Sequence, residues 1–166
     1  MKFMTGAIVL STVMMATAGG AFAAEVTRHK IPNSDFPIAQ AVEIPAGMTT
    51  VYVSGALASV ADEKAPKGSI EAYGDTKTQT VSALQSIEKT LAGMDLKMSD
   101  VVKMQVFLVG DPSKESKMDF KGFMEGYTQF FGTKEQPNLP ARSVFQVAGL
   151  AGPGFLVEIE VIAARP

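Results

Sequence analysis

One nine-residue segment constrains the fold of this 166-residue chain more than any other. Residues 101–109 read Val-Val-Lys-Met-Gln-Val-Phe-Leu-Val, a run that is apolar at nearly every position and rich in β-branched side chains. A strand that is apolar on nearly both faces does not suit a solvated edge of a sheet. We therefore expect residues 101–109 to form a buried, central strand.

The remaining pattern predicts two helices and further strands around this segment. A cap at Asp75 or Thr76 and apolar residues three or four apart predict a helix that ends near Ala92, before Gly93. A second helix is predicted over residues 116–131, with an aromatic stripe typical of a helix face that packs into a core. The other predicted segments are an edge strand and loop after Glu25, strands at 36–44, 49–54, 143–148 and 155–163, and an exposed loop at 60–70.

The resulting order, β-β-β-α-β-α-β-β, predicts an α+β fold. Strands and helices interleave too unevenly for a doubly wound parallel sheet, so a mixed sheet with both helices on one face fits better. The opposite face is then uncovered. Because the last strand carries apolar residues on both faces, we expect another copy of the chain to cover the open face. Along this last strand, the side chains alternate between two faces. Val157, Ile159, Val161 and Ala163 lie on one face, and Leu156, Glu158, Glu160 and Ile162 on the other.

Residues 1–23 are predicted to be a secretory signal peptide rather than part of the fold. A basic start is followed by a charge-free run and by Ala21-Phe22-Ala23, the small-x-small pattern that signal peptidase reads. A retained membrane anchor is the alternative, but no stop-transfer cluster follows the run. We expect cleavage after Ala23 or Ala24. This predicts one domain, residues 24–166, in the periplasm or secreted, with no membrane attachment.

The composition excludes several classes of site and partner. The chain has no Cys and one His, His29, which rules out disulfides, thiol nucleophiles and multi-His metal centres. We interpret His29, between Arg28 and Lys30, as exposed. Signal cleavage removes one Lys and changes the net charge from −2 to −3, and no Lys/Arg run exceeds a pair. We therefore expect no metal, and neither nucleic acid nor a membrane surface as a partner.

Three short segments carry side chains that could act on a ligand. Arg142 enters a predicted strand after a Pro-containing loop, and its planar guanidinium suits a carboxylate, although a surface ion pair is the alternative. Glu158 and Glu160 share one face of an apolar strand, where a partly buried carboxylate could orient or deprotonate water; a solvated pair is the alternative. Ser54 and Gly55 end a strand where a ligand could reach the backbone, or form a simple turn.

In this order, the segments resemble the RidA/YjgF family, also catalogued as endoribonuclease L-PSP proteins. The resemblance runs from about residue 36 to residue 165. Its most specific part is PARS (140–143), followed about fifteen residues later by EIE (158–160). The other matching segments are VYVSG (51–55), QTVSALQSIEKTLAG (79–93), DVVKMQVFLV (100–109), the DF…Y…FF helix (119–131) and VEIEVIA (157–163).

The resemblance implies a chorismate-mutase-like subunit that forms a homotrimer with clefts between neighbouring subunits. In these clefts Arg142 would hold the carboxylate of a small 2-imino or enamine acid, and Glu158 would position the hydrolytic water. Ser54 and Gly55 would lie in the same pocket. The implied reaction is hydrolysis of an imine to a 2-keto acid and ammonia, with no metal or organic cofactor. Which of Glu158 and Glu160 faces the cleft stays open.

The chain departs from the family pattern in the wall of this pocket. Where deaminating members usually have Gly-Pro-Tyr, it has Phe36-Pro37-Ile38, and Met124 stands where Asn is frequent. Both changes remove polar groups. Two functions therefore remain open: a periplasmic imine deaminase with an altered, more apolar pocket, and a trimer that binds a small carboxylate without turning it over. Ribonuclease activity, which the catalogue name suggests, is disfavoured by the acidic charge and the lack of a His or Lys acid–base pair.

Overall fold

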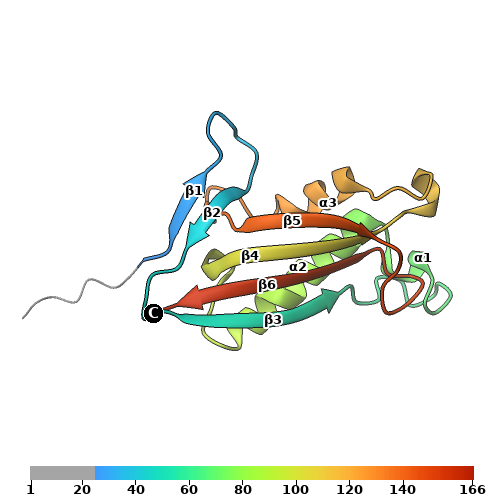
Figure 1. Ribbon diagram of the computed structural model, residues 1–166. Coiled ribbons are helices and arrows are strands. Elements are labelled where there is room, and N and C mark those ends of the chain that lie inside the picture. Colours follow the sequence, from blue (N-terminus) through green and yellow to red (C-terminus); the bar gives the residue numbers. More distant parts are fainter. Residues whose placement is uncertain (1–24) are drawn as a thin grey trace, which may run out of the picture.

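The central strand expected from the sequence lies inside a six-stranded sheet (Figure 1). The structure is a computed structural model that describes residues 25–166. Strand β4 (Val101–Val109) has the predicted bounds, and side chains such as Met104 and Val106 are completely buried. The strand order is β1-β2-β5-β4-β6-β3, so β4 lies between β5 and β6. The predicted signal peptide, residues 1–23, lies outside the described residues.

The other elements follow the predicted order with one addition, the short helix α1. The remaining strands are β1 (Thr27–Lys30), β2 (Ala39–Glu43), β3 (Thr49–Leu57), β5 (Ala141–Val147) and β6 (Val157–Arg165). The helices are α1 (Ile70–Tyr73), α2 (Thr76–Ala92) and α3 (Phe120–Tyr127), with 3-10 turns at η1 (Met98–Asp100) and η2 (Pro112–Lys114).

The sheet is mixed, as predicted. β5 runs parallel to β4 and to β2, whereas β6 runs antiparallel to both β4 and β3. Helices α2 and α3 lie together behind one face of the sheet (Figure 1) and pack against each other. The prediction of an α+β fold with both helices on one face is therefore confirmed.

Helix α3 is shorter than the predicted helix at 116–131. Its N-cap is Asp119, whose carboxylate accepts a hydrogen bond from the Gly122 N–H. Upstream, Glu115 and Ser116 both have left-handed backbones, with φ of +57° and +56°, and a right-handed helix cannot run through them. The aromatic stripe nevertheless packs into the core as predicted. Its completely buried members are Phe123, Tyr127 and Phe131.

Two strand boundaries differ from the prediction for backbone reasons. The strand expected at 36–44 begins only at Ala39, because Pro37 has no N–H and the Ile38 N–H is turned back to the Phe36 carbonyl, 2.8 Å away. Strand β3 continues past residue 54 to Leu57, because a β-bulge carries it around Gly55 without ending the pairing to β6.

The loop expected at 60–70 leads into α1, which docks on the segment before β6. Ser69 caps α1 by accepting a hydrogen bond from the Ala72 N–H. Gly74, with φ of +84°, turns the chain out of the helix. The ring of Tyr73 packs on that of Phe155, with centroids 4.3 Å apart.

Only the helix-covered face of the sheet is buried. On β6, Val157, Ile159 and Val161 are buried beneath the helices, whereas the intervening side chains are half-buried. The open face carries large apolar groups: Tyr52 is 77% exposed and Phe145 46% exposed. The alternation predicted for the last strand is therefore confirmed from Val157 onward, but Leu156, predicted on the open face, precedes β6 and is buried in the core. The oligomer expected from this alternation stays a prediction.

A single buried glutamine ties helix α2 to the start of β6. The Gln79 side chain is completely buried and donates to the carbonyls of Gly74 and Gly154, both at 2.9 Å. Its Oε1 accepts a hydrogen bond from the Leu156 N–H at 2.8 Å. Three backbone groups that the core removes from water are thus satisfied by one amide.

We predict that Gln79→Leu lowers the free energy of unfolding by about 2–4 kcal/mol, because three buried backbone groups lose their partner. Urea unfolding at fixed protein concentration measures the change. Gln129→Leu is the matched control, because its amide bonds the Glu125 carbonyl at an exposed position, and we expect it to change stability by less than about 1 kcal/mol. Equal losses in the two variants would contradict the prediction.

Candidate functional site

Arg142 lies on the helix-covered face of the sheet. It is paired in parallel register with Met104, whose side chain is in the core, so both side chains point toward α3. Three aromatic rings surround its guanidinium carbon. The distances from that carbon to the ring centroids are 4.2 Å for Tyr127, 5.0 Å for Phe123 and 5.6 Å for Phe36. These cation–π contacts hold the charge within an aromatic box.

The hydrogen-bonding capacity of Arg142 is only partly used. Its Nη2 donates to the sulfur of Met124 at 3.3 Å, a weak acceptor, and its Nη1 is buried without a hydrogen-bond partner among the described residues. Burial lowers the pKa of Arg142 below its ordinary value, and the neighbouring Tyr127 opposes this shift. A carboxylate would supply the acceptor that the guanidinium lacks.

Tyr127 connects the aromatic box to the segment before β2. Its hydroxyl donates to the Pro37 carbonyl at 2.9 Å. Burial raises the pKa of Tyr127 to about 12, and the charge of Arg142 opposes this. The bond fixes the Phe36-Pro37-Ile38 segment next to the guanidinium.

The same segment is also held at the start of β5. The Ala39 N–H donates to the Pro140 carbonyl at 3.0 Å, and Ala39 pairs with Ala141, the residue before Arg142. Ile38 is half-buried between Phe36 and this pairing. Thus two of the predicted pocket residues, Ile38 and Met124, lie in the segments that flank Arg142.

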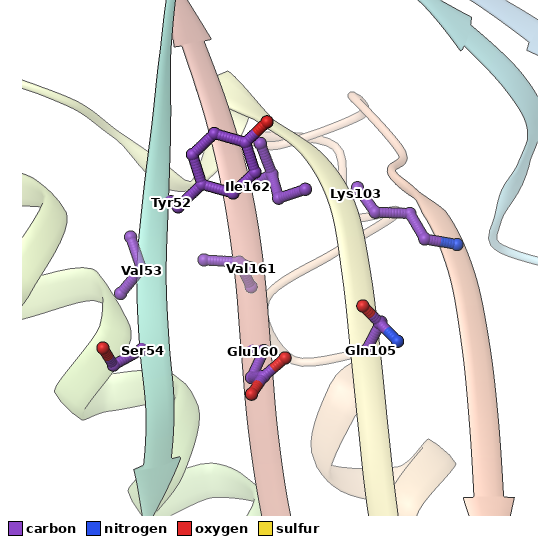
Figure 2. A pocket seen from close by; sticks show the side chains of 8 residues that line it. All are labelled: Tyr52, Val53, Ser54, Lys103, Gln105, Glu160, Val161 and Ile162. Atoms are coloured by element: carbon purple, nitrogen blue, oxygen red, sulfur yellow. The ribbon is translucent and has the colours of Figure 1, made fainter.

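Glu158 belongs to the open face, where β6 meets β3. Ser54 and Gly55 of β3 lie opposite the single residue Glu160, and this two-to-one pairing is the β-bulge. A β-carbon at position 55 would overlap the Glu158 carboxylate, so glycine lets that carboxylate lie against β3. The Ser54 side chain is exposed on the outer side of β3, away from Glu160 (Figure 2). The structure therefore groups Ser54, Gly55 and Glu158 at this edge.

Glu160 lies over a hollow of about 320 Å³ on the open face, which Ser54 also lines (Figure 2). Gln105 is its cross-strand partner on β4, and Lys103 also lines the hollow, with its Nζ donating to Ser143 Oγ at 3.3 Å. Tyr52 stands beside it. The sequence reasoning did not single out these neighbours. The signal was present, because positions 103 and 105 are the polar ones in the apolar run of β4.

One chain does not bring Arg142 and Glu158 together. Arg142 faces the helices and Glu158 faces the open side, because Glu158 is paired with the half-buried Phe107 of the open face. Their strands, β5 and β6, are separated by β4, which places them about 10 Å apart across the sheet, and three residues of register add about 10 Å along it.

The aromatic box has a component that the sequence reasoning placed only in the core. Phe123 and Tyr127 are indeed completely buried core residues, but the same rings face Arg142. The helix stripe alone carried no sign of this second role, because the pairing of an α3 ring with a β5 side chain depends on tertiary packing.

Elsewhere in residues 25–166, Arg28 is also partly buried, and its Nη2 donates to the carbonyls of Ser99 and Val101 at 2.9 and 3.1 Å. His29 is largely exposed, as expected, and its Nε2 lies 2.7 Å from the Glu43 carboxylate. Within residues 25–166, no three His, Cys, Asp or Glu side chains gather as metal ligands would. Over the same range, no helix has the length and apolar character needed to cross a membrane.

Comparison with known proteins identifies relatives of this chain. A family model described as Endoribonuclease L-PSP matches residues 29–165. A 2-iminobutanoate/2-iminopropanoate deaminase of Mus musculus is 30% identical over 142 residues, which cover 84% of this chain and 90% of the relative. A RutC family protein of Pyrococcus horikoshii is 33% identical over 100 residues, which cover 60% of this chain and 71% of the relative.

Solved structures agree with the fold. TdcF of E. coli, whose crystal structure contains bound serine, is 27% identical, with a TM-score of 0.55 over 87% of this chain and 99% of that one. A Rid-family protein of Yersinia pestis is 24% identical, with a TM-score of 0.61 over 83% of this chain and 98% of that one, and shows the same fold.

We predict that alkaline pH destabilises the protein through Tyr127. Because burial raises the pKa of this folded-state phenol to about 12, its contribution is complete below pH 10, where the unfolded phenol is also neutral. Above pH 10 the unfolded phenol ionises first, so the free energy of unfolding falls by about 2–3 kcal/mol as the pH approaches 12.

Urea unfolding of wild type and Tyr127→Phe at about pH 8 and about pH 11.5 measures this effect. The variant lacks the ionisable group, and its stability should fall less over the same interval. If both proteins lose the same stability, the buried phenol does not titrate as argued.

Proposed function

This chain belongs to the endoribonuclease L-PSP family, which is also called RidA/YjgF, and on that premise we propose that it hydrolyses 2-imino acids to 2-keto acids and ammonia. The observation that carries the proposal is the guanidinium of the half-buried Arg142. Its Nη1 has no hydrogen-bond partner within residues 25–166, and its Nη2 donates only to a thioether. The mouse relative, named as an imine deaminase, supports the same reaction class.

Arg142 would anchor the substrate carboxylate. A carboxylate accepts two charged hydrogen bonds from a guanidinium, and each is stronger in a site from which water is removed. The rings of Tyr127 and Phe123 hold the guanidinium plane from the core side, which reduces the ordering required on binding. The imine carbon would thereby be fixed relative to the protein.

Glu158 would act on the attacking water. The water oxygen forms a bond to the imine carbon, the π electrons of C=N move to nitrogen, and Glu158 accepts the proton that water loses. Return of that proton to nitrogen gives a carbinolamine. The carbinolamine hydroxyl then passes its own proton to nitrogen by way of Glu158, and its oxygen forms the C=O bond as the C–N bond breaks with the electron pair on nitrogen. This releases ammonia and leaves the 2-keto acid. Since an imine is already electrophilic, orientation of substrate and water supplies much of the acceleration.

We propose that two copies of the chain form one such site. Arg142 and Glu158 face opposite sides of one sheet, so a pocket that contains both combines Arg142 of one copy with Glu158 of another. The copy that contributes Glu158 would make this contact through its open face, where Tyr52 and Phe145 are exposed in the single chain. We include the homotrimer in the proposal, with three equivalent sites.

The compartment is part of the proposal as well. Residues 1–23 have the features of a secretory signal, so we propose a periplasmic or secreted protein. The substrate would then be a small imino acid met outside the cytoplasm.

A second candidate function is binding without turnover. Ile38 and Met124 provide no strong hydrogen-bonding groups in the segments that flank Arg142, and this favours a trimer that holds a small carboxylate without hydrolysing it. Calorimetry with keto acids separates the two functions. Binding that depends on Arg142, without keto-acid release from any imine, would support the second.

We predict that Arg142→Ala and Glu158→Gln each lower kcat/KM for imine hydrolysis by at least tenfold. Arg142→Ala removes charged hydrogen bonds worth about 1.5–3 kcal/mol, which corresponds to about tenfold to a hundredfold. Imines are generated in situ from amino acids with an amino-acid oxidase, and keto-acid release is followed. Glu160→Gln is the matched control, since it removes a carboxylate from the same face two residues away. Wild type no faster than Arg142→Ala would refute the reaction.

Mixed oligomers test the shared site directly. Arg142→Ala and Glu158→Gln chains, each at most about a tenth as active as wild type alone, should reach roughly a quarter of wild-type activity when co-assembled, because a random mixture restores that fraction of intact sites. Separate assembly followed by mixing without subunit exchange is the control. No recovery in verified mixed oligomers would show that both residues act within one chain.

A further inference from the structure

We infer that the substrate side chain is apolar and larger than a methyl group, and that Phe36 and Met124 select it. This inference rests on the proposed role of Arg142 as carboxylate anchor and goes beyond it to the substrate class. All 2-imino acids share a carboxylate and a C=N group and differ in the side chain. With the carboxylate on Arg142, the side chain would contact the residues next to Arg142.

The contacts of Arg142 show where a ligand can enter. Of the three rings around the guanidinium, Phe123 and Tyr127 are completely buried, whereas Phe36 is 42% exposed. Met124, whose sulfur lies 3.3 Å from Nη2, is half-buried. Phe36 and Met124 are therefore the members of this surrounding that solvent reaches, and a ligand that approaches the guanidinium contacts them first.

These entrance residues favour carbon over polar atoms. A benzyl ring and a thioether gain from contact with aliphatic groups, about 0.8 kcal/mol for each buried methylene in general. They offer a hydroxyl or an ammonium group no strong partner. The nearest polar group in the box, the Tyr127 hydroxyl, already donates to the Pro37 carbonyl. A polar substrate side chain would lose water without replacing its hydrogen bonds.

Kinetic selectivity tests the inference. We compare imines generated in situ from leucine and from alanine, which differ by three carbons at the side chain. Wild type should show kcat/KM at least about tenfold higher for the leucine-derived imine. Phe36→Ala and Met124→Asn should each lower this ratio by about threefold or more, whereas Val60→Ala, on an exposed loop away from Arg142, should leave it unchanged.

Equilibrium binding keeps the test independent of turnover. Calorimetry with 4-methyl-2-oxopentanoate and pyruvate, the two corresponding keto acids, gives a ratio of dissociation constants for each protein. A preference for the larger acid that falls in Phe36→Ala and Met124→Asn supports the inference even if no imine is hydrolysed, an outcome that would end only the proposed reaction.

Three results would overturn the inference. They are equal or reversed preference in wild type, binding of neither keto acid, and a preference that survives both substitutions. Circular dichroism of each variant shows that it is folded, and the paired substrates serve as internal controls, because a general loss of structure lowers both rates without favouring one.

Discussion

Helices α2 and α3 bury one face of the sheet, and the rest of the molecule is arranged around that asymmetry. The covered face holds the apolar half of β6 and, against α3, the guanidinium of Arg142. The uncovered face holds the carboxylates of Glu158 and Glu160 among exposed aromatic side chains. Arg142 and the two carboxylates thus lie on opposite faces of the sheet. The proposed association of two copies would bring Arg142 of one copy next to a carboxylate of another.

The aromatic box explains how an unpaired cation can persist on the buried side. Burying a guanidinium N–H without an acceptor is unfavourable, and the contacts with Tyr127, Phe123 and Phe36 offset part of that cost. The offset is incomplete, because a ring face replaces neither a carboxylate nor water. A carboxylate placed against Nη1 would supply the missing acceptor, as proposed above. The missing hydrogen-bond acceptor, rather than a preformed cavity, distinguishes Arg142 from an ordinary surface arginine.

Strong local patterns predicted the fold, and the tertiary contacts could not be predicted from them. β4 has its expected bounds because seven of its nine residues are apolar. The helix predicted from residue 116 began too early, because the sequence at Glu115 and Ser116 does not indicate two residues with a left-handed backbone. At the site, the motif around Arg142 and the pair of glutamates were visible in the sequence. That they face opposite sides of the sheet depends on the register between β4 and its two neighbours, which local pattern does not encode.

The bulge at Gly55 has a consequence for how the chain can vary. The Glu158 carboxylate occupies the volume that any side chain at position 55 would need. A larger residue at 55 can be accommodated only if residue 158 becomes shorter or turns away, so the two positions should change together among related chains or not at all. Substitution at position 55 of the edge strand β3 is thereby limited by the side chain at position 158 of β6. The same contact limits redesign of either position alone.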